Sequence, residues 1–265
     1  MRAHLKNLKP DKFDDLIAMN ALYRPGPMEY IPNYIKRKHG KEDIEYDLPE
    51  MEDFLSNTYG ITVYQEQVML LSQKLAGFSK GDADMLRKGM GKKIKSVIDK
   101  LKPKFFDGCE KNGFDIKVVE KIWTDWEAFA FYAFNKSHST CYALIAYQTA
   151  YLKANFPVEF LAASMALDSN NTEKLAVFRQ ECQQKQIVVL PPDINCSAAG
   201  FSVEKMSMSD GEEPLAIRYA LSAIKNVGFE AMKRVTEIRD ENGKFVSLKD
   251  LLQRLPREAM NRRQL

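Results

Sequence analysis

Cysteine and histidine are scarce in this sequence of 265 residues, and neither forms a cluster. The four cysteines contain no Cys-x-x-Cys pair, which argues against a zinc site and against a disulfide framework. The three histidines are equally dispersed, so we expect no metal centre built on histidine. The residues concerned are Cys109, Cys141, Cys182, Cys196, His4, His39 and His138.

Long apolar runs are also missing. No stretch reaches the roughly 18 apolar residues that cross a bilayer, and the N-terminal segment MRAHLKNLKP lacks the apolar core of a signal peptide. We therefore expect a cytoplasmic protein with no membrane partner. The net charge is only +3, from 39 basic and 36 acidic residues, so any signal for a polyanionic partner must be local.

Positive charge is concentrated between residues 87 and 104. Eight lysines or arginines stand there against one acid, Asp99, which leaves a local charge of about +7. The segment begins in the cluster MLRKGMGKK at 85–93, where Gly89 and Gly91 are expected to fray a helix and expose backbone N–H groups. Guanidinium, ammonium and amide donors together suit a phosphate. The candidate phosphate ligands are Arg87, Lys88, Lys92 and Lys93. The alternative is a solvated, lysine-rich helix end.

Two other segments have similar chemistry. Arg24 lies in the turn Tyr-Arg-Pro-Gly-Pro, which ends a helix expected at 11–22 and fixes the direction of the arginine. Lys136 and His138 lie in FNKSHS, before a helix expected at 141–156, where a helix dipole favours an anion. The alternatives are a surface arginine at a helix stop and a histidine that caps or packs.

Asp82 and Asp84 form an Asp-x-Asp pair that we do not interpret as a metal site. Ser79 is expected to cap a helix, with Asp82 completing a capping box. Residues two apart on a helix point about 200° away from each other, so these carboxylates cannot close on one ion.

The hydrophobic pattern predicts a mainly α fold. The aromatic-rich helix expected at 115–134 should pack in the core, and the nearly uncharged helix 141–156 is expected at its centre. Thr172 is expected to cap a helix at 173–184. A short strand is predicted at 60–64, followed by a helix at 65–76. A strand at 187–190 is expected to leave the helical body, and strands at 201–204 and 215–219 are expected to pair as a small sheet, with a mobile hairpin tip at 206–214.

The C-terminal segment has the pattern of a helix-hairpin-helix element. A short helix at 221–225 and a helix at 229–239 flank a tight turn, and Ser247 is expected to cap a further helix at 248–255. In such an element main-chain N–H groups approach a nucleic-acid phosphate without reading bases. The candidate DNA-backbone contacts are Lys225, Asn226 and Gly228. Asn226 stands where a glycine is customary and tolerates left-handed geometry.

Seven blocks in one order resemble the bacterial C-family replicative DNA polymerases, the family of the DNA polymerase III alpha subunit. They are ALYRPGPM, TYGITVYQEQVM, ADMLRKGMGKK, FNKSHS, AYQTAYLKANFPVEF, LPPDIN and AIKNVG. The resemblance implies a multi-helix fingers domain with a small β segment, followed by the start of a helix-hairpin-helix module. The implied boundaries are 1–186, 187–219 and 220–265.

The resemblance also implies roles. Arg87 and Lys88 would hold the triphosphate of an incoming deoxynucleotide, with Lys92 and Lys93 adding positive field and Arg24, Lys136 and His138 lining the same pocket. The family's paired arginines are here Arg87 followed by Lys88, which lacks the bidentate fork. Implied partners are dNTP, primer-template DNA, the sliding clamp and other replicase subunits.

No PDxDxD stretch is present, so we expect a fragment with no catalytic residue of its own, ending within a helix at 256–265. The Mg²⁺ that the family uses would be bound by a palm domain outside it. Two other interpretations stay open: a stand-alone nucleic-acid-binding module, and a purely structural helical protein whose basic segments lie on unrelated faces.

Overall fold

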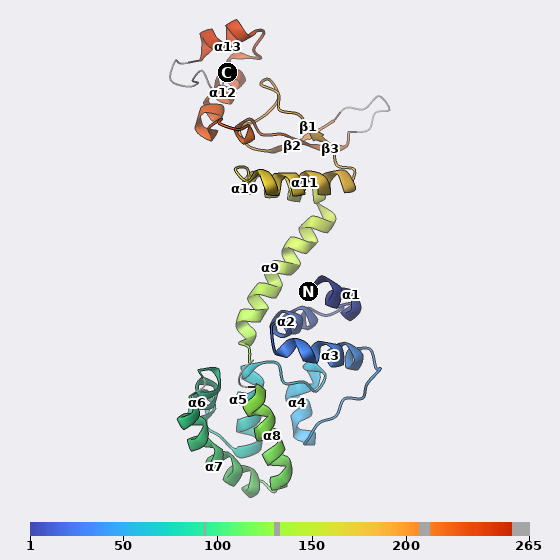
Figure 1. Cartoon of the computed structure of the whole chain (residues 1–265), viewed down its shortest axis with the longest axis vertical. Coiled ribbons are helices and arrows are strands. Elements are labelled where there is room, and N and C mark those ends of the chain that lie inside the picture. The colour runs from blue at the N-terminus through green and yellow to red at the C-terminus, as the bar shows by residue number, and fades with distance from the viewer. Residues whose placement is uncertain (93, 130–132, 207–212, 256–265) are drawn as a thin grey trace. The chain divides into compact units, whose positions relative to one another are not determined.

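The computed structural model describes residues 1–92, 94–129, 133–206 and 213–255. Contacts between Cα atoms divide the chain into two compact units, Met1–Tyr147 and Gln148–Leu265. The described residues are mainly helical with one small sheet, which confirms the predicted fold class (Figure 1). The functional boundaries at 186 and 219 stay predictions. Lys93, most of the hairpin tip and the terminal helix at 256–265 lie outside the described residues.

The first unit is a set of helices around two apolar clusters. Helices α5, α6 and α7 contact one another, and α8 packs on α7 (Figure 1). Trp123 and Trp126 of α8 are buried against Phe105 of α7, whose ring centroid lies 5.1 Å from each of theirs. Trp123 and Trp126 are therefore core, as predicted for the aromatic segment, whereas residues 130–132 of the helix expected at 115–134 lie outside the described residues. The elements are α1 Arg2–Leu8, α2 Phe13–Leu22, α3 Ile31–Lys38, α4 Glu52–Leu55, α5 Gln65–Ala76, α6 Lys80–Gly91, α7 Lys95–Lys111 and α8 Ile116–Phe129, with the 3-10 turns η1 Pro27–Tyr30, η2 Pro49–Met51 and η3 Ser56–Thr58.

Local sequence signals place α5 and α6 correctly. α5 ends at Gly77, whose φ of +66° favours glycine, and Ser79 Oγ accepts a hydrogen bond from the Asp82 N–H at 3.1 Å. The strand expected at 60–64 is wrong, because only one bridge forms there, between Tyr64 and Phe134. Pairing stops at once since helices begin almost directly after both residues.

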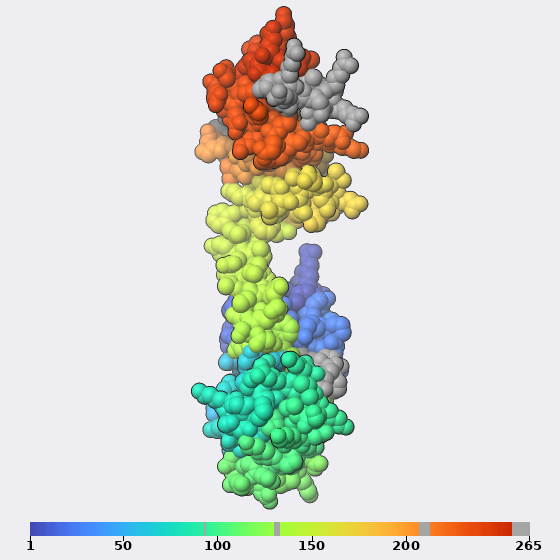
Figure 2. Space-filling model, turned by 90° about the vertical axis from the view of Figure 1, so that its left-hand side faces the viewer, coloured from blue at the N-terminus to red at the C-terminus, as the bar shows by residue number. Residues whose placement is uncertain are grey.

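Helix α9, Lys136–Asn155, differs from its prediction in start and in burial. The helix begins before Cys141 because Asn135 caps it: the Asn135 side chain accepts from the His138 N–H at 2.8 Å. Ser139 and Ala143 are its buried residues, whereas Tyr142 and Ile145 are each 57% exposed. The expected central core helix is therefore wrong; its apolar side chains form part of the surface in Figure 2, where it is lime green.

The second unit contains two helices against a small sheet. Strand β3, Leu215–Arg218, pairs parallel with β1, Val189–Leu190, and antiparallel with β2, Ser202–Lys205, in the order β1-β3-β2. This sheet confirms the predicted strands. Ile217 packs with residues of α10, Pro157–Leu167, and α11, Thr172–Gln184.

Caps and turns of the second unit match the predictions in part. Asn171 caps α11 by accepting from the Lys174 N–H at 3.1 Å, so the expected cap at Thr172 is one residue off. The short helix expected at 221–225 is the 3-10 turn η4, Leu221–Ala223. Two helices follow: α12 Phe229–Asn242 and α13 Leu248–Arg254. Ser247 caps α13 as predicted, accepting from the Asp250 N–H at 3.1 Å.

None of the described helices has both the length and the hydropathy that are required to span a bilayer.

Candidate functional site

Arg87 and Lys88 share one carboxylate on α6. The Arg87 Nε and Nη2 donate to Asp84 Oδ1 at 3.0 and 2.8 Å, and the Lys88 Nζ lies 2.7 Å from Asp84 Oδ2. Hydrogen bonds from Lys88 and then Arg87 lower the pKa of Asp84 below its ordinary value. Both cations therefore rest against an anion that a phosphate could replace.

Asp82 has other partners, which agrees with the interpretation of the Asp-x-Asp pair. Its carboxylate accepts from Lys104 Nζ at 2.7 Å and from Ser79 Oγ at 2.5 Å. Asp82 therefore completes the capping box of α6 and pairs with Lys104 of α7. Asp84 instead pairs with Arg87 and Lys88 further along α6.

The glycines of the basic cluster do not fray α6, contrary to expectation. Gly89 is buried, and a Cβ there would lie 3.0 Å from Val97 Cγ1 of α7, so glycine allows the two helices to pack closely. Gly91 is the last residue of α6, and a Cβ there would lie 3.3 Å from Gln65 Nε2. The basic end of α6, which continues into exposed Lys92, therefore lies against the start of α5.

Arg24 and His138 meet at one aromatic ring. The Arg24 guanidinium carbon lies 4.2 Å from the centroid of the Phe134 ring, a cation–π contact, and burial lowers the pKa of Arg24. The His138 ring centroid is 5.4 Å from that of Phe134 and 4.7 Å from that of Tyr142. The turn that follows Arg24 is restrained by Pro25 and Pro27, and Gly26 between them adopts a φ of +97°, which favours glycine.

The segment around Phe134 is held by the start of α5. The Gln65 N–H donates to the Phe134 carbonyl at 2.9 Å, and Gln65 Nε2 donates to the Ala133 carbonyl at 3.1 Å. Gln65 therefore lies beside Gly91 at the end of α6 and bonds the segment that carries Phe134. This residue joins the two basic segments that sequence reasoning proposed.

The N-terminus of α9 already holds an anion from the same chain. The Lys136 N–H donates to both carboxylate oxygens of Glu66, at 3.0 and 3.1 Å, and Asn135 Nδ2 donates to Glu66 Oε1 at 2.8 Å. The Lys136 Nζ extends over the Tyr64 ring, 5.4 Å from its centroid. The anion at this helix end is thus the Glu66 carboxylate, whereas the Lys136 side chain lies over the Tyr64 ring and does not bind that carboxylate in the bonds described.

Ser139 has a structural role within FNKSHS. It is fully buried, and its Oγ donates to the Ile17 carbonyl of α2 at 2.6 Å. Asn20 Nδ2 donates to the Ser139 carbonyl at 3.3 Å. These bonds dock α9 on α2, the helix that leads to Arg24.

The structure thus brings some of the predicted phosphate ligands of the first unit close together and places the others on a neighbouring helix. Arg24, Lys136 and His138 surround Phe134 and its bridge partner Tyr64. Lys92 follows the contact with Gln65, and Arg87 and Lys88 lie one helical turn before it. Lys93 lies outside the described residues. Three organising residues, Gln65, Glu66 and Phe134, were not predicted as part of the site from the sequence, although all three fall within the blocks that carry the family resemblance.

The second unit presents the predicted hairpin contacts on its surface. Lys225, Asn226 and Gly228 are all exposed, and Asn226 adopts a φ of +69°, the left-handed geometry expected of it. A Cβ at Gly228 would meet no atom within 4 Å. Gly228 is the N-cap of α12 and has no side chain, so it leaves the first backbone N–H groups of the helix without a side-chain cap of its own.

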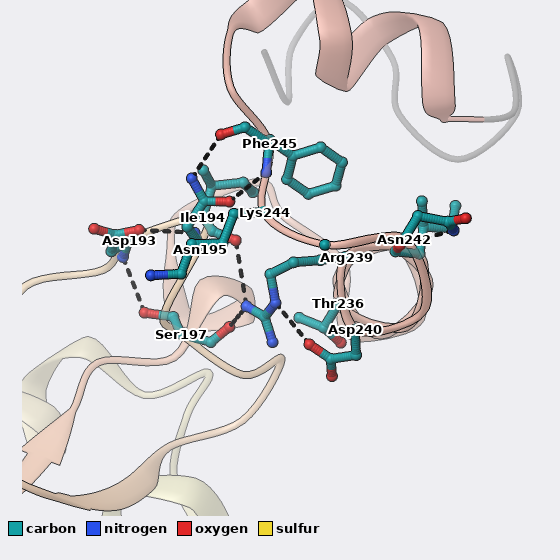
Figure 3. A network of polar contacts seen from close by, with 12 residues as sticks. Asp193, Ile194, Asn195, Ser197, Thr236, Arg239, Asp240, Asn242, Lys244 and Phe245 are labelled. Atoms are coloured by element: carbon teal, nitrogen blue, oxygen red, sulfur yellow. Dashed lines mark hydrogen bonds and ion pairs between the residues drawn. The ribbon is translucent and has the colours of Figure 1, made fainter.

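The segment LPPDIN holds the hairpin helices in place. Arg239 of α12 points at the loop between β1 and β2 and donates to the Ser197 carbonyl at 2.6 Å (Figure 3). Asn195 pairs with the backbone of Phe245: its Nδ2 donates to the carbonyl at 2.9 Å, and its Oδ1 accepts from the N–H at 2.8 Å. This block of the sequence is therefore structural, and it orients α12.

Comparison with known proteins gives the same assignment for both units. Residues 1–113 match the family described as the bacterial DNA polymerase III alpha subunit finger domain, and residues 186–265 match a helix-hairpin-helix motif. The DNA polymerase III subunit alpha of Chlamydia trachomatis is 46% identical over 98% of this chain and 20% of the relative. Those of Thermus aquaticus and Aquifex aeolicus are 43% and 44% identical over 100% and 99% of this chain, and over 21% and 22% of the relatives.

The chain therefore spans about a fifth of the length of the curated relatives it matches. The match covers nearly every residue of the chain, and the finger and hairpin matches fall in the order that the sequence blocks predicted. The chain belongs to the bacterial DNA polymerase III alpha subunit family, of which it represents the finger and helix-hairpin-helix segment.

Proposed function

We propose that this chain is the finger portion of a replicative DNA-directed DNA polymerase. Its first unit would bind the triphosphate of the incoming dNTP through Arg87, Lys88, Lys92 and Lys93, with Arg24, Lys136 and His138 lining the pocket. The observation that carries the proposal is the position of Gln65, which lies beside Gly91 at the basic end of α6 and donates to the Ala133 carbonyl next to Phe134.

The contribution of these cations is electrostatic. Arg87 can exchange the single Asp84 oxygen that accepts both of its N–H groups for phosphate oxygens, because its planar guanidinium can donate two N–H groups to either anion. Fixed positive charge around the phosphates would offset the negative charge that builds on the pyrophosphate leaving group. Arg24, partly desolvated on Phe134, keeps its guanidinium in one place for the same purpose.

The metal of the reaction is assigned to no residue of this segment. Within the described ranges no group of three or more histidine, cysteine, aspartate or glutamate side chains could hold an ion, and Asp82 and Asp84 are engaged with lysine and arginine. Mg²⁺ would bind in the palm of the whole polymerase.

The second unit would grip the backbone of the primer-template duplex through Lys225, Asn226 and the Gly228 amide. Exposure of all three residues and the open space at Gly228 support this role. The sliding clamp and other replicase subunits follow from the family as partners of the whole protein.

Titration calorimetry of the chain with dATP tests the proposal. We expect wild-type binding that Arg87→Ala weakens by at least about tenfold, since a charged hydrogen-bonding partner is worth about 1.5–3 kcal/mol. Duplex binding that is insensitive to dATP and to Arg87→Ala, with no dATP binding, would instead favour a stand-alone nucleic-acid-binding module.

A further inference from the structure

We propose that Glu66 is a positioning residue for the triphosphate site. Its carboxylate fixes the first turn of α9, and with it the Phe134 ring that Arg24 and His138 share. The inference rests on the proposed function of this cluster. The proposed positioning role of Glu66 strengthens nucleotide binding, whereas its negative charge alone would weaken it.

The contacts of Glu66 converge on the residues that start α9. Its two oxygens accept from the Lys136 N–H at 3.0 and 3.1 Å, and one of them also accepts from Asn135 Nδ2 at 2.8 Å. Asn135 in turn caps the helix through the His138 N–H at 2.8 Å. One half-buried carboxylate thereby holds both the cap residue and the first residue of α9.

Asn135 is adjacent in the chain to Phe134, which contacts Arg24 and His138. Phe134 directly precedes Asn135, and its carbonyl is held by the Gln65 N–H at 2.9 Å. The ring of Phe134 is the surface on which Arg24 lies at 4.2 Å and His138 at 5.4 Å. Releasing Asn135 and Lys136 from Glu66 therefore frees one side of the segment whose Phe134 ring contacts Arg24 and His138.

Charge alone predicts the opposite outcome. A carboxylate that binds the Lys136 N–H repels a triphosphate bound nearby, so its removal by itself would tighten binding. A positioning role predicts that removal weakens binding, because the cations lose their arrangement. The sign of the change in affinity separates the two effects.

Two substitutions and one control measure that sign. Glu66→Ala removes charge and acceptors, whereas Glu66→Gln removes the charge and keeps one acceptor oxygen for the Lys136 N–H. Glu120→Ala removes one exposed glutamate from α8 in the same unit and serves as the control for charge. Each chain is titrated with dATP, and amide hydrogen exchange at Lys136 is measured in the same samples.

We expect Glu66→Ala to bind dATP about tenfold more weakly than wild type, with Glu66→Gln within about threefold and Glu120→Ala unchanged or slightly tighter. Faster exchange of the Lys136 amide in Glu66→Ala should accompany the loss. Equal or tighter dATP binding by Glu66→Ala overturns the proposal. So does a loss in Glu66→Gln as large as in Glu66→Ala.

The failure of the proposed function has a separate signature. If the wild-type chain binds no dATP, the triphosphate role is wrong, and amide exchange alone then decides the positioning role. Unchanged exchange at Lys136 in Glu66→Ala overturns it; faster exchange limited to residues 134–139 supports it.

Discussion

Arg87 and Lys88 both pair with Asp84, and they differ in how each could bind a phosphate in its place. Arg87 donates two N–H groups to one oxygen, and Lys88 places a single ammonium 2.7 Å from the other. A guanidinium fork can transfer to a phosphate as a unit, whereas an ammonium acts as a point charge. The two residues should therefore contribute unequally to transition-state stabilisation.

In the full-length polymerase, Arg87→Ala should lower the rate of single-turnover nucleotide incorporation by on the order of 10² to 10³, the typical effect of removing one donor to developing charge. Lys88→Ala should lower it less. Rapid-quench measurement of incorporation at saturating dNTP checks both. A near-normal rate for Arg87→Ala would remove the assignment, and an equal loss for both variants would contradict the argument from the fork.

At the scale of the element, α7 crosses the end of α5 so closely that one glycine decides the packing. A Cβ at Gly108 would lie 2.1 Å from the backbone oxygen of Ala76. In a helix, glycine to alanine normally stabilises, but here the backbone of α5 would have to move. The free energy of unfolding of Gly108→Ala should fall by on the order of 3 kcal/mol.

Gly81 provides the matched control for that substitution. It lies in the first turn of α6, where the nearest atom to an added Cβ is 3.7 Å away, so Gly81→Ala should raise stability by about 0.5 kcal/mol. Urea denaturation of both variants gives the two values. A Gly108→Ala protein as stable as wild type would show that α5 and α7 are not packed as described.

The N-terminus of α6 should make stability depend on pH in the acid range. Hydrogen bonds from Lys104 and then Ser79 lower the pKa of Asp82 from 3.8 to about 2. Because folding favours the carboxylate, this stabilisation is complete above pH 3.8 and is lost as pH falls toward 2. The stability difference between wild type and Asp82→Asn should therefore shrink over that interval. Urea midpoints at several pH values measure it, and a constant difference would refute the assignment.

Helix boundaries were predictable where the signal is local. Ser79 and Ser247 cap helices by bonds that span three residues, so the sequence contains all that is needed. The start of α9 was misplaced because the apolar pattern begins at Cys141, whereas the cap is Asn135. Its exposure could not be predicted, since apolar composition does not say whether another element packs on the helix.

The candidate site divides in the same way. The cations themselves could be named from charge clustering and turn chemistry, as at Arg24 and Arg87. The residues that arrange them could not, because their partners are distant: Gln65 bonds Ala133, 68 positions away, and Glu66 bonds Lys136, 70 positions away. Only the fold brings such pairs together.

At the scale of the molecule, each unit has its own apolar clusters, so changes in one should leave the other intact. Phe105 and Leu71 belong to a cluster of the first unit, and Val235 and Leu251 to one of the second. Arg87→Ala should therefore weaken dATP binding without changing affinity for duplex DNA. Hairpin substitutions should do the converse.

The hairpin allows charge and shape to be tested separately. Lys225→Ala should weaken duplex binding and reduce the slope of log affinity against log salt by about 1 if Lys225 neutralises one phosphate. Gly228→Ala carries no charge change, so it should weaken binding at every salt concentration and leave the slope unaltered. Because its Cβ would enter open space, it should cost only about 0.5 kcal/mol of stability through the helix cap.

Fluorescence anisotropy with a labelled duplex across a salt series measures the affinity of wild type, Lys225→Ala and Gly228→Ala. If Lys225→Ala leaves both affinity and slope unchanged, the hairpin is not a DNA contact; if Gly228→Ala alone has no effect, lysine charge rather than the backbone amides holds the duplex.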